Sequence, residues 1–410
     1  MGTWLQSINN WLRGALLSLV VMAIAMGWPN VGALPALALP RITAEQRLFL
    51  PLSLEFLSAY ELPTQEFEQT RVGGLSALTY DRQRDRFYAL SDDRSEFAPA
   101  RFYTLQLQLT QADSKRPKIQ QIEIESVTLL RDETGQTFAR GTVDPEGMAL
   151  SPARSLWISS EGVTRENIPA FIKEFDLQTG QALRDLPIPE QYQPLREDGR
   201  QVRGIRDNLG FESLTINPGS YGSIGLEPFR LFVATEAALA QDLDATAGET
   251  RNRLLHYMID AGQITTPLRR TPSALVVSEH LYPLASPPAL TIAHGLTELL
   301  ALDQGGHFLG LERSFGGGEF TVRLFQLATG GANDIRDRPS LQGELRGVAP
   351  IRKQLLLDLR ALGIRLDNLE GMTLGPQLPD GSPSLVLVSD DNFRSEQVTQ
   401  FLLFRLKGLK

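Results

Sequence analysis

Short apolar stretches separated by turn-rich connectors recur along most of the chain. The stretches are four to six residues long and rich in β-branched and aromatic side chains, and the connectors contain runs such as Asp380-Gly381-Ser382-Pro383. Such lengths and compositions are typical of β-strands joined by tight turns. Only residues Lys353–Leu362 show an apolar spacing that suits an amphipathic helix. The pattern therefore predicts an all-β protein.

The predicted strands follow a two-part signature that occurs five times. A first strand opens on Ser or Glu, in Ser76–Tyr80, Glu146–Leu150, Glu212–Ile216, Glu298–Leu302 and Glu370–Leu374. A second strand ends on Asp or Glu, in Phe87–Asp92, Leu156–Glu161, Leu231–Glu236, Phe308–Glu312 and Leu385–Asp390. The copies begin 70, 66, 86 and 72 residues apart. A long repeat of a strand-rich unit indicates a propeller or a solenoid.

We favour a closed β-propeller, because radial closure protects the strand edges that an open array would expose. Propeller blades usually take roughly 40–50 residues. Units of this greater length therefore carry long loop insertions, most clearly at residues 183–209 and 239–253, or conceal an extra blade, so the sequence allows five or six blades. We expect the N-terminal stretch Leu48–Tyr60 to pair with Gln400–Leu406 and close the ring.

The N-terminus has the pattern of a secretory signal. Residues 14–28 are apolar and follow Arg13, and the Ala36-Leu37-Ala38 sequence offers a cleavage site. The run is shorter than the roughly 20 residues of a membrane span. We therefore expect a signal peptide at residues 1–38, a propeller domain at residues 39–410, no membrane span after cleavage, and a periplasmic or extracellular location. An uncleaved anchor is the alternative.

Composition narrows the chemistry. The 410 residues include no cysteine, which excludes disulfides, thiolate nucleophiles and zinc–sulfur sites, and the four histidines are few for a multi-histidine metal cage. The 48 acidic residues exceed the 40 basic ones, giving a net charge of −8. Nucleic-acid binding needs a strongly basic face, so we do not expect a nucleic-acid partner. We expect cations or small ligands as partners. We also expect the protein to be a monomer.

The repeated acids are the candidate functional residues. Innermost strands of a propeller surround one axis, so a residue that recurs in each blade forms a ring. Glu146, Glu212 and Glu370 are candidate catalytic residues at the first repeat position, which Glu298 shares and which Ser76 occupies in the remaining copy. The candidate metal ligands at the second position are Asp92, Glu161, Glu236, Glu312 and Asp390. Converging carboxylates would bind a hard cation such as Ca²⁺. Alternatively, each acid accepts backbone hydrogen bonds and fastens its blade.

Arginines and one histidine accompany these acids. Arg94, Arg206, Arg313 and Arg394 lie close to the repeated acids and are candidate ligands of an anionic ester or phosphate. His294, just before the fourth copy, is a further candidate catalytic residue. The chain lacks a Gly-x-Ser-x-Gly sequence, so a serine hydrolase elbow is not supported. The glycines at residues 316–318 lack the Lys-Ser/Thr of a phosphate-binding loop and predict a hairpin turn.

Several motifs occur in order along the chain: Gly73-Gly74-Leu75-Ser76, Ser91-Asp92-Asp93-Arg94, Asp144-Pro145-Glu146-Gly147, Arg206-Asp207-Asn208-Leu209-Gly210-Phe211-Glu212, Thr235-Glu236, Leu311-Glu312-Arg313-Ser314-Phe315, Asp367-Asn368-Leu369-Glu370-Gly371-Met372 and Ser389-Asp390-Asp391-Asn392-Phe393. Across residues 70–408 the chain resembles the phytase-like family, described by an esterase-like activity of phytase. The resemblance implies an exported bacterial β-propeller that hydrolyses phosphoric or other esters. The aspartate-rich motif of the calcium-dependent propeller phytases is absent.

Three functions are consistent with these patterns and with what the resemblance implies. The first is an exported hydrolase of a small anionic ester or phosphoester, in which a carboxylate-bound cation polarises the substrate and activates water. The second is a lactonase-like propeller enzyme that uses the same cation. The third is a non-catalytic periplasmic binding propeller whose central acids only tie the blades together.

Overall fold

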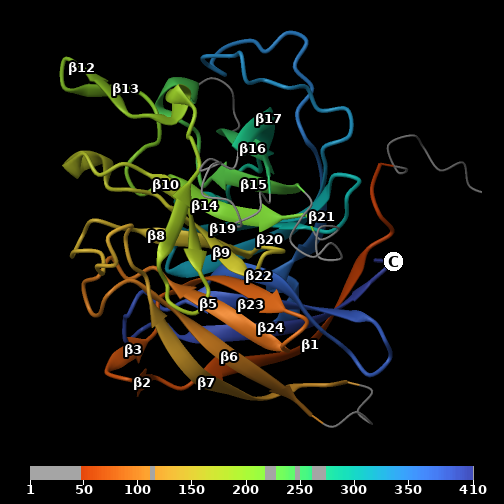
Figure 1. The fold of residues 1–410 in the computed structure, drawn as a ribbon. Helices are drawn as coiled ribbons and strands as arrows, with labels where there is room; N and C mark the ends of the chain where they lie inside the picture. Colours follow the sequence, from red (N-terminus) through yellow and green to blue (C-terminus); the bar gives the residue numbers. More distant parts are fainter. Residues whose placement is uncertain (1–47, 111–115, 218–227, 245–249, 261–273, 410) are drawn as a thin grey trace, which may run out of the picture. The chain divides into compact units, whose positions relative to one another are not determined.

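The computed structural model describes residues 48–110, 116–217, 228–244, 250–260 and 274–409 (Figure 1). The expected signal peptide and its cleavage site lie outside these residues. Within the described part, no helix is long and apolar enough to cross a membrane.

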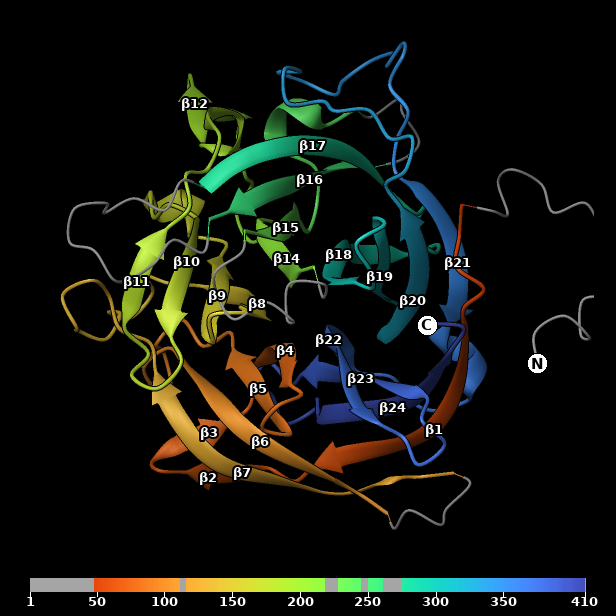
Figure 2. The same ribbon diagram turned by 45° about the vertical axis from the view of Figure 1, so that its right-hand side comes forward.

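Five four-stranded antiparallel sheets surround one axis as the blades of a propeller, which confirms the predicted all-β class and gives five blades (Figure 2). In blades 1 to 4 the strands run from the axis outward in chain order. Blade 1 contains β4 (Leu75–Asp81), β5 (Arg86–Ser91), β6 (Arg101–Leu109) and β7 (Ile119–Leu129); blade 2 contains β8 (Pro145–Leu150), β9 (Ser155–Ser160), β10 (Phe171–Asp176) and β11 (Ala182–Asp185). Blade 3 contains β14 (Phe211–Ile216), β15 (Phe229–Thr235), β16 (Thr250–Ile259) and β17 (Ala274–Leu284); blade 4 contains β18 (Thr291–Ala301), β19 (His307–Gly316), β20 (Glu319–Ala328) and β21 (Arg352–Asp358).

Blade 5 combines the two ends of the described chain. It contains β22 (Asn368–Gln377), β23 (Pro383–Asp390), β24 (Thr399–Lys407) and β1 (Ser53–Leu62). Strand β1 is antiparallel to β24, with Ser53 opposite Lys407 and Leu62 opposite Thr399. The predicted closure by the terminal strands is therefore confirmed, and hydrogen bonds of the main chain lock the ring without a disulfide.

The core lies between neighbouring blades. Strands near the axis have another blade against each face, which is why all six residues of β9 and of β14 are buried. One apolar cluster joins Leu75 and Phe87 of blade 1 to Val386 and Phe401 of blade 5. Burial on both faces explains the runs of consecutive apolar residues seen in the sequence, such as Leu156–Ile158 in β9 and Leu231–Ala234 in β15.

The remaining elements lie outside the blades. They are the hairpins β2 (Gln65–Phe67) with β3 (Thr70–Val72) and β12 (Leu195–Glu197) with β13 (Arg200–Arg203), and the 3₁₀ turns η1 (Thr164–Glu166), η2 (Glu190–Tyr192), η4 (Ala240–Asp242) and η5 (Leu359–Leu362). The predicted insertion at 183–209 contains η2 and the β12–β13 hairpin. The one at 239–253 contains η4, but its last residues begin β16.

The helix expected at Lys353–Leu362 is wrong. Its first part is the outer strand β21, in which Lys353 lies opposite Leu327 of β20, and only the short turn η5 follows. Here the unpaired edge of β20 accepts a fourth strand, and this tertiary pairing overrides the local helical spacing.

Candidate active site at the channel mouth

Each innermost strand has a β-bulge where it reaches one mouth of the central channel. A bulge leaves one or more residues unpaired and redirects their side chains. The unpaired residues are Ser76 in β4, Glu146 and Gly147 in β8, Glu212 in β14, Thr297 in β18 and Glu370 in β22. The first repeat position therefore forms a ring because the same bulge recurs in every blade.

The residue before each bulge pairs with a residue of the second strand. The second repeat position is the residue that follows this partner along the second strand. It is occupied by Asp92, Glu161, Glu236, Arg313 and Asp390. In four blades this residue is an acid. In blade 4 it is Arg313, which lies opposite Gly295.

The fourth copy is thus displaced by one residue from its alignment in the sequence. Leu296 lies opposite Glu312, in the place that Ser91, Ser160, Thr235 and Ser389 occupy in the other blades. Glu298 correspondingly takes the place of the small residues Ala77, Gly147, Ser213 and Gly371. A shift of one residue turns a side chain to the other face of a sheet, so neither Glu298 nor Glu312 joins the ring.

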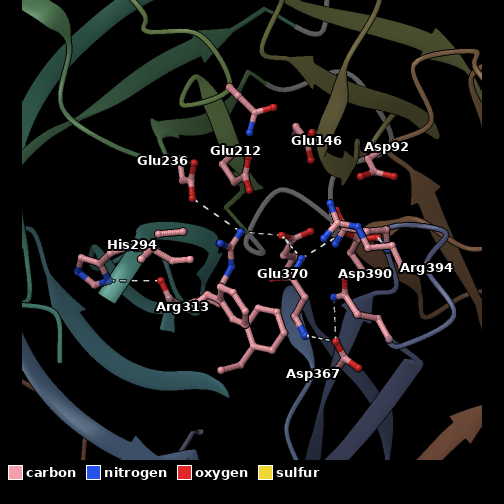
Figure 3. Close-up of a pocket in the computed structure, with 18 of the residues that line it drawn as sticks. Asp92, Glu146, Glu212, Glu236, His294, Arg313, Asp367, Glu370, Asp390 and Arg394 are labelled. Atoms are coloured by element: carbon pink, nitrogen blue, oxygen red, sulfur yellow. Dashed lines mark hydrogen bonds and ion pairs between the residues drawn. The ribbon is translucent and has the colours of Figure 1, made fainter. Parts of the chain in front are cut away.

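The mouth is a single cavity of about 1700 Å³. Seven of the expected carboxylates gather here or immediately behind its wall: Asp92, Glu146, Glu161, Glu212, Glu236, Glu370 and Asp390. Figure 3 shows several of them pointing toward one space. The structure thus brings together acids that lie as far apart in the sequence as Asp92 and Asp390.

In three overlapping groups, the acids lie close enough together to bind one cation in common. In each group, carboxylate oxygens lie within 4.8 Å of one another, and the groups are Asp144, Glu146 and Glu161; Glu146, Glu212 and Glu370; and Glu161, Glu212 and Glu236. Glu146, Glu161 and Glu212 each belong to two groups. Carboxylate oxygen is the donor that hard cations such as Ca²⁺ prefer, so the donor set suits such an ion.

Burial and mutual repulsion shape the electrostatics of these acids. Burial, and next the charge of Glu236, raise the pKa of Glu212 well above its ordinary value. For Glu146, burial and next the charge of Glu212 raise the pKa in the same way. Asp92 and Asp390 follow the same pattern. Without a cation, the ring therefore favours the retention of protons.

Arg313 supplies a positive charge inside the ring. Its Nη2 donates a hydrogen bond of 2.7 Å to Glu370 Oε1 and lies 3.7 Å from Glu236 Oε1 (Figure 3). Burial still raises the pKa of both acids, although Arg313 opposes that shift. An arginine in this place orients the acids of two neighbouring blades and offers a guanidinium to an anion.

The other predicted arginines also line the cavity. Arg94 holds Asp144 through two hydrogen bonds, of 2.7 Å from Nε and 2.5 Å from Nη2, and Nη2 also donates to Asn208. Arg206 donates from Nε to the carbonyl oxygen of Ala238 at 2.9 Å. Arg394 is exposed at the rim. Arg94 is therefore committed to an internal ion pair, whereas Arg394 is open to a ligand.

Glu312 and His294 lie away from the acidic ring. Glu312 is buried against Tyr282, which donates to it at 2.7 Å, and Lys353, whose Nζ lies at 2.5 Å. His294 lines the rim, where Nδ1 lies 3.3 Å from the carbonyl oxygen of Arg313 (Figure 3). Nε2 donates to the carbonyl oxygen of Ala285 at 2.6 Å, and Nδ1 also lies 2.8 Å from Ser314 Oγ. Burial lowers the pKa of His294. Both ring nitrogens therefore have protein partners, and its catalytic role stays a prediction.

Glu298 is a buried acid on the axis side of blade 4. Backbone N–H groups of Leu299, Leu214 and Met372 donate to its carboxylate, and the Leu299 bond is 2.9 Å. These donors belong to blades 4, 3 and 5. Burial raises the pKa of Glu298 well above its ordinary value despite these bonds. The carboxylate accepts hydrogen bonds from the unpaired inner strand edges of three blades. This is the fastening role that the sequence analysis gave as an alternative.

We expect Glu298→Ala to lower the free energy of unfolding by about 3 kcal/mol, because it leaves buried N–H groups without an acceptor. Cation affinity should stay unchanged, since the side chain is outside the ring. Urea unfolding and calorimetric titration with CaCl₂ measure the two quantities. Loss of cation affinity with unchanged stability would assign Glu298 to the site instead.

Sequence reasoning missed two side chains at the site. Asp144 is buried beside Glu146 and shares an acidic group with it. Asn368 donates from Nδ2 to Glu370 at 2.8 Å and to Asp390 at 3.2 Å, while its Oδ1 is buried without a partner. Both residues lie two positions before a repeated glutamate, Glu146 or Glu370, in motifs already noted in the sequence, and this proximity was the available signal.

Comparisons with known proteins give one family and several distant structures. The family model named phytase-like, described as esterase-like activity of phytase, matches residues 70–393. No curated protein matches the chain. An endo-arabinase structure from Bacteroides thetaiotaomicron VPI-5482 is 10% identical, with a TM-score of 0.38, over 82% of this chain and 94% of that one. The catalytic domain of a Coprinopsis cinerea GH62 α-L-arabinofuranosidase is also 10% identical, with a TM-score of 0.38, over 87% and 98%.

These structural similarities are too distant to indicate an activity. The family match is different in kind, because it covers well over half of the chain and includes all of blades 1 to 4 and the two inner strands of blade 5. It also confirms the resemblance that the ordered motifs indicated. The protein belongs to the phytase-like family of β-propellers.

Proposed function

We propose that the protein is a cation-dependent hydrolase of small ester substrates, phosphoric or carboxylic, with its active site at the channel mouth. The observation that carries the proposal is the convergence of carboxylates around Glu212, which is 7% exposed and has no hydrogen-bond or ion-pair partner among the described residues. A buried, unpaired carboxylate destabilises a fold, and a bound cation removes that cost.

Charge balance also supports a cation. Asp144 and the seven ring acids face the guanidiniums of Arg94, Arg206 and Arg313, so the fully ionised set is strongly negative. An anionic ester would be repelled by such a site. One divalent cation reduces the excess without cancelling it, and we therefore expect protons to be retained or a second cation to bind.

The chain's residues have separable roles in this proposal. Glu146, Glu212 and Glu370, with the acids beside them, would hold a hard cation such as Ca²⁺. The cation, once bound, would polarise an ester oxygen and lower the pKa of water. Arg313 and Arg394 would orient the anionic end of the substrate. Hydrolysis adds the oxygen of water to phosphorus or to the carbonyl carbon, breaks the ester bond, and returns a proton to the departing alcohol.

Turnover and binding together test the proposal. Chelated protein is assayed on aryl phosphates, aryl acetates and a simple lactone, with and without Ca²⁺, while calorimetry measures Ca²⁺ binding. Ca²⁺-dependent hydrolysis of the phosphates or acetates supports the proposal, and hydrolysis of the lactone alone supports a lactonase-like enzyme. Binding of Ca²⁺ without turnover supports a binding propeller, and absence of binding refutes the cation site.

A further inference from the structure

Blade 4 extends farther at the channel mouth than the other blades. In blades 1, 2 and 3 the second strand ends at the position equivalent to Glu312, which is Ser91, Ser160 or Thr235. In blade 5 it ends one residue later, at Asp390. In blade 4 the second strand, β19, continues four residues farther, to Gly316. The strands on both sides of it extend as well: Thr291 lies opposite Gly316, and Gly316 lies opposite Glu319. Blade 4 therefore forms a raised wall beside the acidic ring.

The wall is apolar where it faces the cavity. Residues directly opposite one another in a sheet share a face, and Phe315 lies opposite both Ala293 and Phe320. The Phe315 and Phe320 rings are 4.8 Å apart, and Ile292, also in the cavity lining, is 78% exposed. Ala293, Phe315 and Phe320 are half-buried. Contiguous apolar side chains that keep part of their surface in water mark binding surfaces more often than isolated ones do. We call Ile292, Ala293, Phe315 and Phe320 the blade 4 wall.

The wall and the ring belong to the same site. Arg313 and Phe315 are two residues apart on β19, so their side chains project from the same face, roughly 7 Å apart along the strand. Both line the single cavity of about 1700 Å³. A bound phosphate or acetyl group would fill only a small part of this volume. The ring would bind the charged end of a ligand. The four residues of the blade 4 wall have no charged side chain and would bind an uncharged, apolar part.

We propose that the substrate of this site is amphiphilic, with an anionic ester head at the ring and an alkyl chain against the blade 4 wall. The inference rests on the proposed function and specifies its substrate class. A compact polyanion without an apolar part would leave Ile292 and the accessible parts of the two phenylalanines in water. An alkyl chain removes their surface from water and gains affinity with each methylene group buried.

A second aromatic pair lines the cavity and provides a contrast. Phe97 and Phe393, which follow the second strands of blades 1 and 5, have ring centroids 4.6 Å apart, and Phe97 is 60% exposed. Arg101 and Arg71 lie over the Phe393 ring, at 5.8 and 5.4 Å from its centroid. The Phe393 ring thus already contacts two arginines of the protein. For this reason we assign the alkyl chain of the substrate to the blade 4 wall.

Binding, measured apart from turnover, tests the inference. Calorimetry compares methyl phosphate with octyl phosphate, below its micelle-forming concentration and with Ca²⁺ present. We expect octyl phosphate to bind the wild-type protein at least about tenfold more tightly. The advantage should be lost in Ile292→Ser and Phe320→Ser. It should persist in Leu355→Ser, a matched change at a residue of β21 that is 50% exposed and is not part of the cavity lining.

The outcomes separate this inference from the proposed function. Equal affinities for the two phosphates, absence of binding by either, or an octyl advantage lost only in Phe97→Ser overturns the assignment of an alkyl chain to the blade 4 wall. Tighter octyl binding that depends on Ile292 and Phe320, without hydrolysis of any ester, supports the wall while refuting the hydrolase. Circular dichroism of each variant confirms that the fold is retained.

Discussion

We expect Glu212→Gln to lower divalent-cation affinity and ester hydrolysis together, each by about 100-fold, while the propeller remains folded. Glu212 belongs to two of the three acidic groups, so its loss removes a ligand oxygen from both. Glutamine keeps the size of the side chain but removes its negative charge. Calorimetric titration with CaCl₂ and the ester assay measure the two losses in parallel.

The same substitution should not destabilise the cation-free protein. Glu212 has no hydrogen bond or ion pair to lose among the described residues, and its neighbours Glu236 and Glu161 carry like charge. Neutralising it relieves repulsion, so the melting temperature in chelator should stay equal or rise. A residue that fastens a blade would behave in the opposite way, as we expect for Glu298.

Glu190→Gln is the matched control. Glu190 lies outside the repeat, its side chain is 81% exposed, and it pairs with Arg203 at 2.9 Å on the surface. Exposed pairs contribute little, so this change should leave stability, cation affinity and turnover near their original values. If Glu212→Gln also kept full affinity and turnover, the repeated acids would be fasteners of the blades.

We expect removal of divalent cations to lower the melting temperature markedly at neutral and alkaline pH and only slightly near pH 5. Burial and like charges raise the pKa values of Asp92, Glu146, Glu212 and Asp390 in the folded protein. A raised pKa means that the folded state holds more protons than the unfolded state. Stability of the cation-free protein therefore falls as pH rises from the ordinary carboxyl range toward the raised pKa values.

A bound cation changes this dependence, because it neutralises the carboxylates and binds only the folded state. Thermal melts in chelator and in millimolar Ca²⁺, across pH 5 to 8, measure the effect. Cation binding should also release protons, so its calorimetric enthalpy should vary with the ionisation enthalpy of the buffer. A melting temperature that ignores both chelator and Ca²⁺ at pH 8 would contradict a cation site.

Much of the fold could be read from local patterns. Strands buried between blades are apolar on both faces, so they appear as continuous apolar runs, and their repetition indicated a propeller. The pairing of Leu48–Tyr60 with Gln400–Leu406 followed because an open ring would expose strand edges. The number of blades did not follow, since spacings near 70 residues leave the outer strands and their long connectors undefined.

The site was predicted less completely, and blade 4 shows why. The alignment of the repeat copies placed Glu298 and Glu312 beside the other repeated acids, but the bulged residue of blade 4 is Thr297, one residue before Glu298. The shift sends Glu298 to the backbone of three blades and Glu312 to Lys353 and Tyr282, and it brings Arg313 into the ring. A spacing along the chain does not reveal which residue a bulge leaves unpaired.

The sequence alone determined the class of fold, the closure of the ring and the identity of most acids that meet at its mouth, because burial and repetition leave direct traces in residue type. Tertiary structure decided which side of each strand a residue occupies and which partners it meets. Arg313 between Glu236 and Glu370, and the blade 4 wall above it, depend on contacts between residues far apart in the chain. Such contacts arise from strand register and blade packing, which a local pattern of residues does not reveal.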